Sequence, residues 1–206
     1  MRQRVGWMSA AAIGAGAGNA QRRGLPAADR RRHVPVWALL LALASSAAWA
    51  QLKPGAAPNI VEISPRLVTA GQPTAEALAE LRAQGFDAVV YLAPPTVSDA
   101  VRDEAVIVGR QGLVFVNIPI RFDAPTEQDF EALAAVLKGL GERRVLVHCQ
   151  INLRASSMVF LYRVIAAKED PARAHDAVAA VWSPEGAWKR YLQTMLRKHG
   201  VNFEPY

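Results

Sequence analysis

The chain has 206 residues, of which 51% are hydrophobic and 20% are charged, and this composition is typical of a globular protein that can bury a core. Its formal net charge of +6 lies in the N-terminal region, because residues 1–50 contain seven Arg and one acidic residue, Asp29, whereas basic and acidic residues are equal in number over 51–206. This balance excludes nucleic acid as an expected partner of the folded part.

Residues 1–50 are expected to form an N-terminal extension that includes a signal peptide. A basic stretch at 30–33 precedes an apolar run at 36–44, and Ala48-Trp49-Ala50 places small residues at the −3 and −1 positions of a cleavage site. Because the apolar run is too short to span a bilayer comfortably, we expect export to the periplasm and no stable membrane insertion after cleavage. The alternative is a membrane anchor formed by residues 34–50.

The remaining chain is expected to contain a linker at 51–58, rich in Pro, Ala and Gly, and a single domain over 59–206. Short strand-like runs at 59–63 and 67–70 flank a Ser64-Pro65 turn. Strands are then expected at 86–92, 113–120 and 145–148, and helices at 74–84, 98–112, 126–140, 154–167 and after the Asp170-Pro171 and Ser183-Pro184 pairs. Alternating strands and helices predict an α/β fold with a central, mostly parallel sheet flanked by helices.

The stretch 144–156 (RVLVHCQINLRAS) is the most informative part of the sequence. A buried strand ends at His148, a six-residue loop runs from Cys149 to Arg154, and a helix follows. Loop amides and a helix N-terminus together form an anion site, and the same field favours the thiolate of Cys149. Arg154 adds a planar, permanently charged fork that suits phosphate-like oxyanions. The chain has one cysteine, so an internal disulfide is excluded.

The neighbours of Cys149 have expected supporting roles. The loop residues should contact the bound ligand, and the loop contains no glycine, so Asn152 is the best candidate for a left-handed position. Ser156 could donate a hydrogen bond to the sulfur, and His148 is expected to orient the loop. The expected ligand-binding residues are Gln150, Ile151, Asn152, Leu153 and Ser156. No metal or cofactor is expected, because the four His and one Cys have no ligand spacing.

His148-Cys149 followed by Arg154 and Ser156 resembles the signature of the protein tyrosine and dual-specificity phosphatase superfamily. The stretch 63–73 (ISPRLVTAGQP), with 86–92 and Ile118-Pro119-Ile120, is similar to the phosphatase-like domain of bacterial beta-lactamase-hydrolase-like proteins. The resemblance covers roughly 59–166.

This resemblance implies a cysteine-phosphatase-like fold and an enzyme that hydrolyses a phosphoester of a small molecule or protein through a phosphocysteine. Cys149 would be the nucleophile, and Arg154 with the loop amides would hold the oxyanion. Asp123 lies in the loop where the superfamily places its general acid, which implies that role. The alternative for Asp123 is a turn residue before Pro125.

The loop departs from the superfamily signature, which has five residues between Cys and Arg where this chain has four. A six-residue loop that starts at Cys is also the size found in rhodanese-type sulfurtransferases. The alternative enzyme is therefore a sulfurtransferase that carries a Cys149 persulfide and takes its sulfur from a donor. A third interpretation is a non-catalytic module that binds an anion in the loop.

Overall fold

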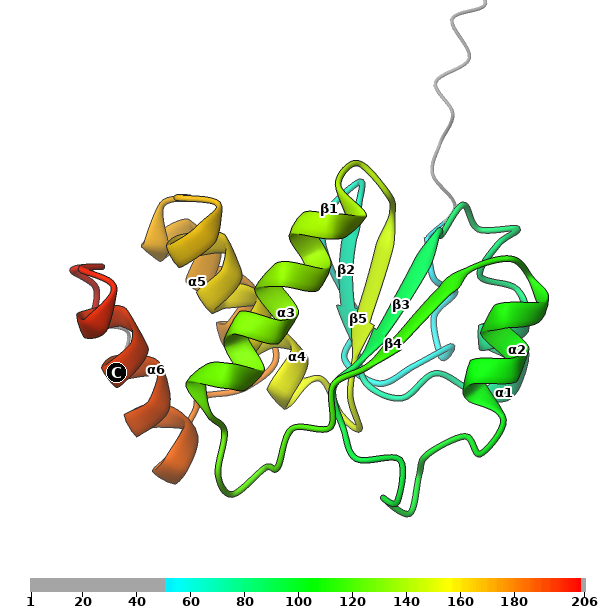
Figure 1. Cartoon of the computed structure of the whole chain (residues 1–206), viewed down its shortest axis with the longest axis horizontal. Helices are drawn as coiled ribbons and strands as arrows, with labels where there is room; N and C mark the ends of the chain where they lie inside the picture. Colours follow the sequence, from blue (N-terminus) through cyan, green and yellow to red (C-terminus); the bar gives the residue numbers. More distant parts are fainter. Residues whose placement is uncertain (1–50, 205–206) are drawn as a thin grey trace, which may run out of the picture. The chain divides into compact units, whose positions relative to one another are not determined.

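The computed structural model describes residues 51–204, so the expected signal peptide and the alternative anchor lie outside the described residues. The domain contains a five-stranded sheet of order β1-β2-β5-β3-β4, in which β1 runs antiparallel to β2 and the other neighbours are parallel. The strands are β1 (Val61–Ser64), β2 (Leu67–Ala70), β3 (Ala88–Tyr91), β4 (Val114–Asn117) and β5 (Val145–His148). The predicted α/β fold with a mostly parallel sheet flanked by helices is confirmed (Figure 1).

Two groups of helices cover the sheet (Figure 1). α1 and α2 lie on one side, and the longer helices from α3 onward lie on the other. The helices are α1 (Ala75–Ala79), α2 (Glu104–Arg110), α3 (Glu127–Leu140), α4 (Leu153–Leu161), the π-helix η2 (Tyr162–Ala166), α5 (Pro171–Ala179) and α6 (Gly186–Lys198). Within residues 51–204, none of these helices has the length and apolar character needed to cross a membrane.

β5 lies at the centre of the sheet and is buried on both faces. Its side chains alternate between two hydrophobic clusters, because successive residues of a strand point to opposite faces. Val145 and Val147 belong to the cluster that includes residues of α3, α4 and α6, whereas Leu146 belongs to the cluster that includes residues of α1 and α2. A strand buried on both faces is apolar along most of its length, and the apolar run at 145–147 made this strand predictable.

Several local sequence signals shape the helices as predicted. Thr126 and Asp129 form a reciprocal capping box at the start of α3, with the Asp129 amide donating to Thr126 Oγ1 at 3.2 Å and the Thr126 amide donating to Asp129 Oδ2 at 2.8 Å. Asp170 Oδ1 accepts a hydrogen bond from the Arg173 amide at 2.9 Å, and Pro171 occupies the first position of α5.

Other elements differ from their predicted bounds. β4 ends at Asn117, before Pro119, which has no amide hydrogen to continue a ladder. α1 ends at Ala79, and α6 begins at Gly186 rather than directly after Ser183-Pro184. The helix expected from position 98 begins only at Glu104, and the residues before it form turns. These turns bring Asp99 to the same edge of the sheet as Cys149.

Candidate active site

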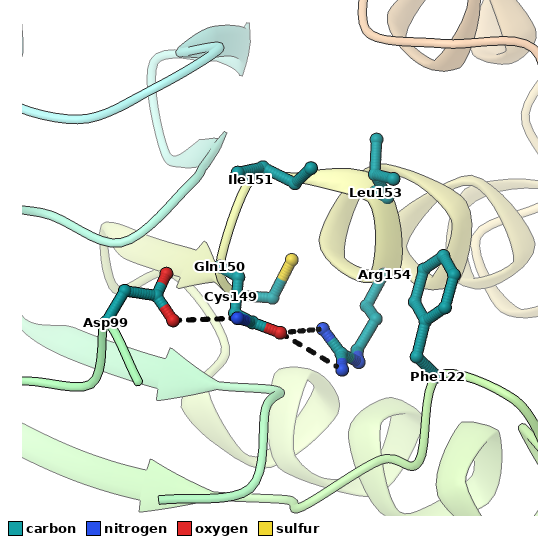
Figure 2. Close-up of a pocket in the computed structure, with 7 residues that line it drawn as sticks. All are labelled: Asp99, Phe122, Cys149, Gln150, Ile151, Leu153 and Arg154. Carbon is teal, nitrogen blue, oxygen red and sulfur yellow. Dashed lines mark hydrogen bonds between the residues drawn. The ribbon is translucent and has the colours of Figure 1, made fainter. Parts of the chain in front are cut away.

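A pocket of about 240 Å³ opens at the edge of the sheet where the parallel strands end. Three segments line it, and each follows a different strand: the loop after β3, the loop after β4, and the turn from β5 into α4. The lining residues, drawn in Figure 2, are Asp99, Phe122, Cys149, Gln150, Ile151, Leu153 and Arg154. The carboxyl ends of parallel strands are a common place for ligand sites in α/β proteins.

Cys149 follows directly after β5 and is fully buried as a residue, although it contributes to the pocket lining. Its amide donates to the carbonyl of Ala70 at 3.3 Å, so the first loop residue still pairs with β2. The nucleophile predicted from the sequence is therefore fixed by the central strand and faces a cavity.

Asn152 takes the left-handed conformation predicted for it, with φ of 71°. Its side-chain amide donates to the carbonyl of Asn59 at 2.6 Å and to Thr69 Oγ1 at 3.1 Å. The residue is fully buried and is not part of the pocket lining. Asn152 thus shapes the loop from behind, and the predicted contact of this residue with the ligand stays a prediction.

The backbone carbonyls of the loop are bonded away from the pocket. The Gln150 carbonyl accepts from the Gln72 amide at 2.8 Å, and the Ile151 carbonyl accepts from Asn59 Nδ2 at 3.0 Å. Among the described residues, the amides of Gln150 and Ile151 have no backbone acceptor, which leaves these two donors available for an anion. Such donors next to a helix N-terminus are the usual components of an oxyanion site.

Arg154 is 6% exposed and lies inside the pocket wall. Its Nε donates to the carbonyl of Ile120 at 3.1 Å, which fixes the guanidinium plane. The two terminal nitrogens, Nη1 and Nη2, lie 3.4 and 3.5 Å from Gln150 Oε1. The ring of Phe122 lies against the guanidinium, with its centroid 5.1 Å from Cζ. Within residues 51–204, the terminal nitrogens make only these long hydrogen-bond contacts, with Gln150, and are therefore positioned to receive an oxyanion.

Ser156 and Leu153 follow the loop into α4. The sequence had suggested that the Ser156 hydroxyl could donate a hydrogen bond to the sulfur. In the structure it donates to the carbonyl of Leu153 at 3.2 Å instead. Ser156 is buried and does not line the pocket, whereas Leu153 and the half-exposed Ile151 do. The mouth of the site is thus apolar on the α4 side (Figure 2).

His148 is fully buried behind the loop. Its Nε2 lies 2.6 Å from Glu104 Oε1, and Glu104 Oε2 in turn accepts from Gln72 Nε2 at 3.0 Å. The imidazole stacks on the ring of Tyr91 with centroids 4.7 Å apart. Burial raises the pKa of Tyr91, helped by the charges of Glu104 and Asp99, so its hydroxyl stays protonated. This arrangement suits the orienting role predicted for His148, and Glu104 is a supporting residue that no sequence motif indicated.

Asp123 lies outside the set of residues that line the pocket. Its side chain is 71% exposed and accepts two hydrogen bonds from Arg121, at 3.2 Å from Nε and 2.6 Å from Nη2. The hydrogen bond with Arg121 lowers the pKa of Asp123, which favours its ionised form. The structure therefore does not bring the predicted acid to Cys149, and the acidic residue in the lining is Asp99, which the sequence did not indicate.

No group of three or more His, Cys, Asp or Glu within residues 51–204 is arranged to hold a metal ion. The pocket offers one sulfur, one guanidinium, one carboxyl and free loop amides. This set can attack an electrophile, hold an oxyanion and move a proton.

Comparisons with known proteins indicate the family to which the chain belongs. Residues 49–192 match the family described as "DSP-PTPase phosphatase fused to NAD+ Kinase". The chain is 28% identical over 149 residues to the beta-lactamase hydrolase-like protein of Xylella fastidiosa, and the match covers 69% of this chain and 33% of that protein. The chain thus spans about a third of the length of that relative.

Solved structures share the fold. The DUF442 protein of Shewanella putrefaciens CN-32 is 27% identical, with a TM-score of 0.63 over 70% of this chain and 95% of that one. TpbA of P. aeruginosa, solved in complex with pTyr, is 21% identical, with a TM-score of 0.56 over 77% of this chain and 94% of that one. The chain therefore belongs to the family described as DSP-PTPase phosphatase fused to NAD+ kinase, and its domain is a phosphatase-like domain of the protein tyrosine and dual-specificity phosphatase superfamily.

Proposed function

We propose that this domain is a cysteine-dependent phosphatase that hydrolyses a phosphoester of a small molecule or protein through a phosphocysteine at Cys149. The observation that carries the proposal is the presence of Cys149 and the Arg154 guanidinium in one pocket, on a strand–loop–helix turn with free loop amides. Membership of a phosphatase family supports the same reaction class.

In the first step, the Cys149 thiolate attacks phosphorus, and a sulfur–phosphorus bond forms as the ester phosphorus–oxygen bond breaks. Arg154 and the amides of Gln150 and Ile151 hold the equatorial oxygens, where negative charge is concentrated in the transition state. In the second step, water attacks the phosphocysteine, which releases inorganic phosphate and restores the thiolate. The departing alcohol needs a proton in the first step.

The Gln150 side chain occupies a position from which a bound substrate can displace it. Its Oε1 contacts both terminal nitrogens of Arg154 at 3.4 and 3.5 Å, distances at which a hydrogen bond is weak. A phosphoryl group can form shorter, charge-assisted bonds with the same nitrogens. Substrate binding should therefore replace this contact at little cost.

The length of the loop favours a second candidate function, sulfur transfer. In that reaction the Cys149 thiolate takes the outer sulfur atom of thiosulfate, which releases sulfite and leaves a persulfide. The persulfide then gives its sulfur to an acceptor such as cyanide, forming thiocyanate and restoring the thiolate. The six-residue loop of Cys149–Arg154, which contains no glycine, is the feature in favour of this chemistry.

Parallel assays of the purified protein test both candidates. We expect release of phosphate from 4-nitrophenyl phosphate, complete loss of this activity in Cys149→Ser, and a decrease of kcat/KM by about 10² to 10³ in Arg154→Lys, which loses the bidentate fork. Acid quenching during turnover should trap one phosphoryl group on Cys149, detectable by mass spectrometry. Turnover of thiosulfate with cyanide but of no phosphate ester would contradict the proposal and establish the second candidate.

A further inference from the structure

The acidic side chain in the wall of the pocket is that of Asp99, from the turn region between β3 and α2. Figure 2 shows it across the pocket from Phe122, with Gln150 and Arg154 between them. Asp99 is exposed, so it can exchange protons with water. Its carboxyl group contacts Gln150, the residue after Cys149.

One carboxyl oxygen of Asp99 is held in place and the other is not. Gln150 Nε2 donates to Asp99 Oδ1 at 2.7 Å, and the same amide group contacts Arg154 through its Oε1. Within the described part of the chain, Oδ2 of Asp99 has no hydrogen-bond partner. A carboxyl group held through one oxygen can carry a proton on the other and present it to a bound ester.

The surroundings of Asp123, in contrast, favour its ionised form. Both of its carboxyl oxygens accept hydrogen bonds from Arg121, and its side chain is 71% exposed. A carboxylate in a bidentate pair with arginine retains its charge and is a poor proton donor. To act on the substrate, Asp123 would have to leave Arg121 and turn into the pocket.

We propose that Asp99 is the general acid of the phosphatase reaction, a catalytic residue that donates its proton to the departing alcohol. This inference rests on the proposed function. As the thiolate of Cys149 forms the sulfur–phosphorus bond, the ester oxygen takes the proton of Asp99 and leaves as the neutral alcohol. The Asp99 carboxylate then accepts a proton from the water that attacks the phosphocysteine, so the enzyme returns to its starting state.

The experiment compares two phosphate esters that differ in the basicity of the leaving group. 4-Nitrophenyl phosphate has a weakly basic leaving group and needs little protonation, whereas phenyl phosphate needs more. Three variants of the full chain are compared with the wild type: Asp99→Asn, Asp123→Asn and, as a control, Asp103→Asn. Asp103 is an exposed acid four residues further along that does not line the pocket.

We expect Asp99→Asn to lower kcat/KM for phenyl phosphate by about 10² or more and to affect 4-nitrophenyl phosphate much less. The alkaline limb of the pH profile, which reports loss of the proton from the acid, should disappear in the same variant. Asp123→Asn and Asp103→Asn should behave like the wild type. Asparagine keeps the oxygen that accepts from Gln150, so urea unfolding of Asp99→Asn should match the wild type.

Three outcomes would overturn the inference. A loss that depends on the leaving group in Asp123→Asn, with Asp99→Asn unaffected, would assign the proton to Asp123. An equal loss on both esters with an unchanged pH profile in Asp99→Asn would make Asp99 a binding residue only. Absence of phosphate release from either ester by the wild type would contradict the proposed function itself, and the assignment of Asp99 with it.

Discussion

Asn152 holds a left-handed backbone conformation in the loop that carries Cys149. A residue other than glycine with φ of 71° is strained, and the cost for most L-residues is about 1–2 kcal/mol. Asparagine tolerates this region better than most residues, and here its side-chain amide also donates to the carbonyl of Asn59, which precedes β1, and to Thr69 Oγ1 of β2. The Asn152 side chain thus favours the left-handed turn and also holds the loop to the neighbouring segments by hydrogen bonds.

The two contributions of Asn152 can be separated by substitution. Asn152→Gly should keep the backbone conformation and lose the hydrogen bonds, whereas Asn152→Ala should lose the bonds and add strain. We expect both variants to be less stable than the wild type, with the Ala variant lower by a further ~1 kcal/mol in free energy of unfolding measured in urea. Equal stability of the two variants would show that the left-handed conformation carries no cost at this position.

The positions of the candidate site residues were predictable where they depend on local sequence. Cys149 and Arg154 belong to one strand–loop–helix turn, and the lack of glycine in the loop pointed to Asn152. Asp99 was not predictable, because its place in the pocket depends on how a turn 50 residues earlier in the chain folds against the loop. Asp123 was selected for its loop, but the arginine two positions before it determines what its carboxyl group binds.

The end of β2 lies very close to the loop that carries Cys149. A Cβ atom on Gly71 would lie 2.7 Å from the carbonyl oxygen of Gln150 and 3.0 Å from Cα of Ile151. Both neighbours are backbone atoms, which cannot move away as a flexible side chain does. Gly71 is therefore required for the contact between β2 and the loop.

Gly71→Ala should displace the loop that carries Cys149. We expect the free energy of unfolding to decrease by about 1–3 kcal/mol, as for other overpacked sites, and phosphatase activity to decrease more than this loss of stability explains. Gly139→Ala is the matched control, because a Cβ atom there meets nothing within 4 Å and the residue lies in α3. The control should be stabilised by about 0.5–1 kcal/mol, measured by urea unfolding. Unchanged activity in Gly71→Ala would contradict the requirement for close approach.

Element bounds were predictable where the signal is strong on both sides. β5 occupies 145–148 as predicted, because charged residues precede its apolar run and the loop follows it. The apolar run at 113–120 gave a strand that was too long, because Pro119 interrupts the ladder of β4. The end of α4 was less predictable, since an apolar helical pattern does not distinguish α4 from the π-helix that continues it.

The helix α6 supports the pocket from the side of Phe122. The Phe122 ring lies 5.9 Å from the ring of Trp188, in α6, and 6.1 Å from that of Trp182. Trp188 Nε1 also donates to the carbonyl of Phe122 at 2.8 Å. Phe122 in turn lies against the Arg154 guanidinium. α6 thus contacts the guanidinium of Arg154 indirectly, through the ring of Phe122.

The two tryptophans flank the same phenylalanine ring but differ in burial and in the partner of the indole N–H group, because Trp188 is fully buried and Trp182 is partly buried. Trp188 Nε1 has the Phe122 carbonyl as its acceptor, whereas Trp182 Nε1 is a buried donor with no partner among residues 51–204. Replacement by phenylalanine removes the same atoms in both. Trp188→Phe loses a hydrogen bond, and Trp182→Phe removes a donor that was costly to bury.

We therefore expect Trp188→Phe to be less stable than Trp182→Phe by about 1–3 kcal/mol in urea unfolding. Because the Phe122 carbonyl loses its anchor only in Trp188→Phe, this variant alone should raise KM for 4-nitrophenyl phosphate, by a few fold on the scale of one hydrogen bond. Equal stability and equal KM in the two variants would mean that ring packing alone holds the loop after β4, which contains Phe122. A higher KM in Trp182→Phe alone would place the support of Phe122 on the segment between α5 and α6 instead of on α6.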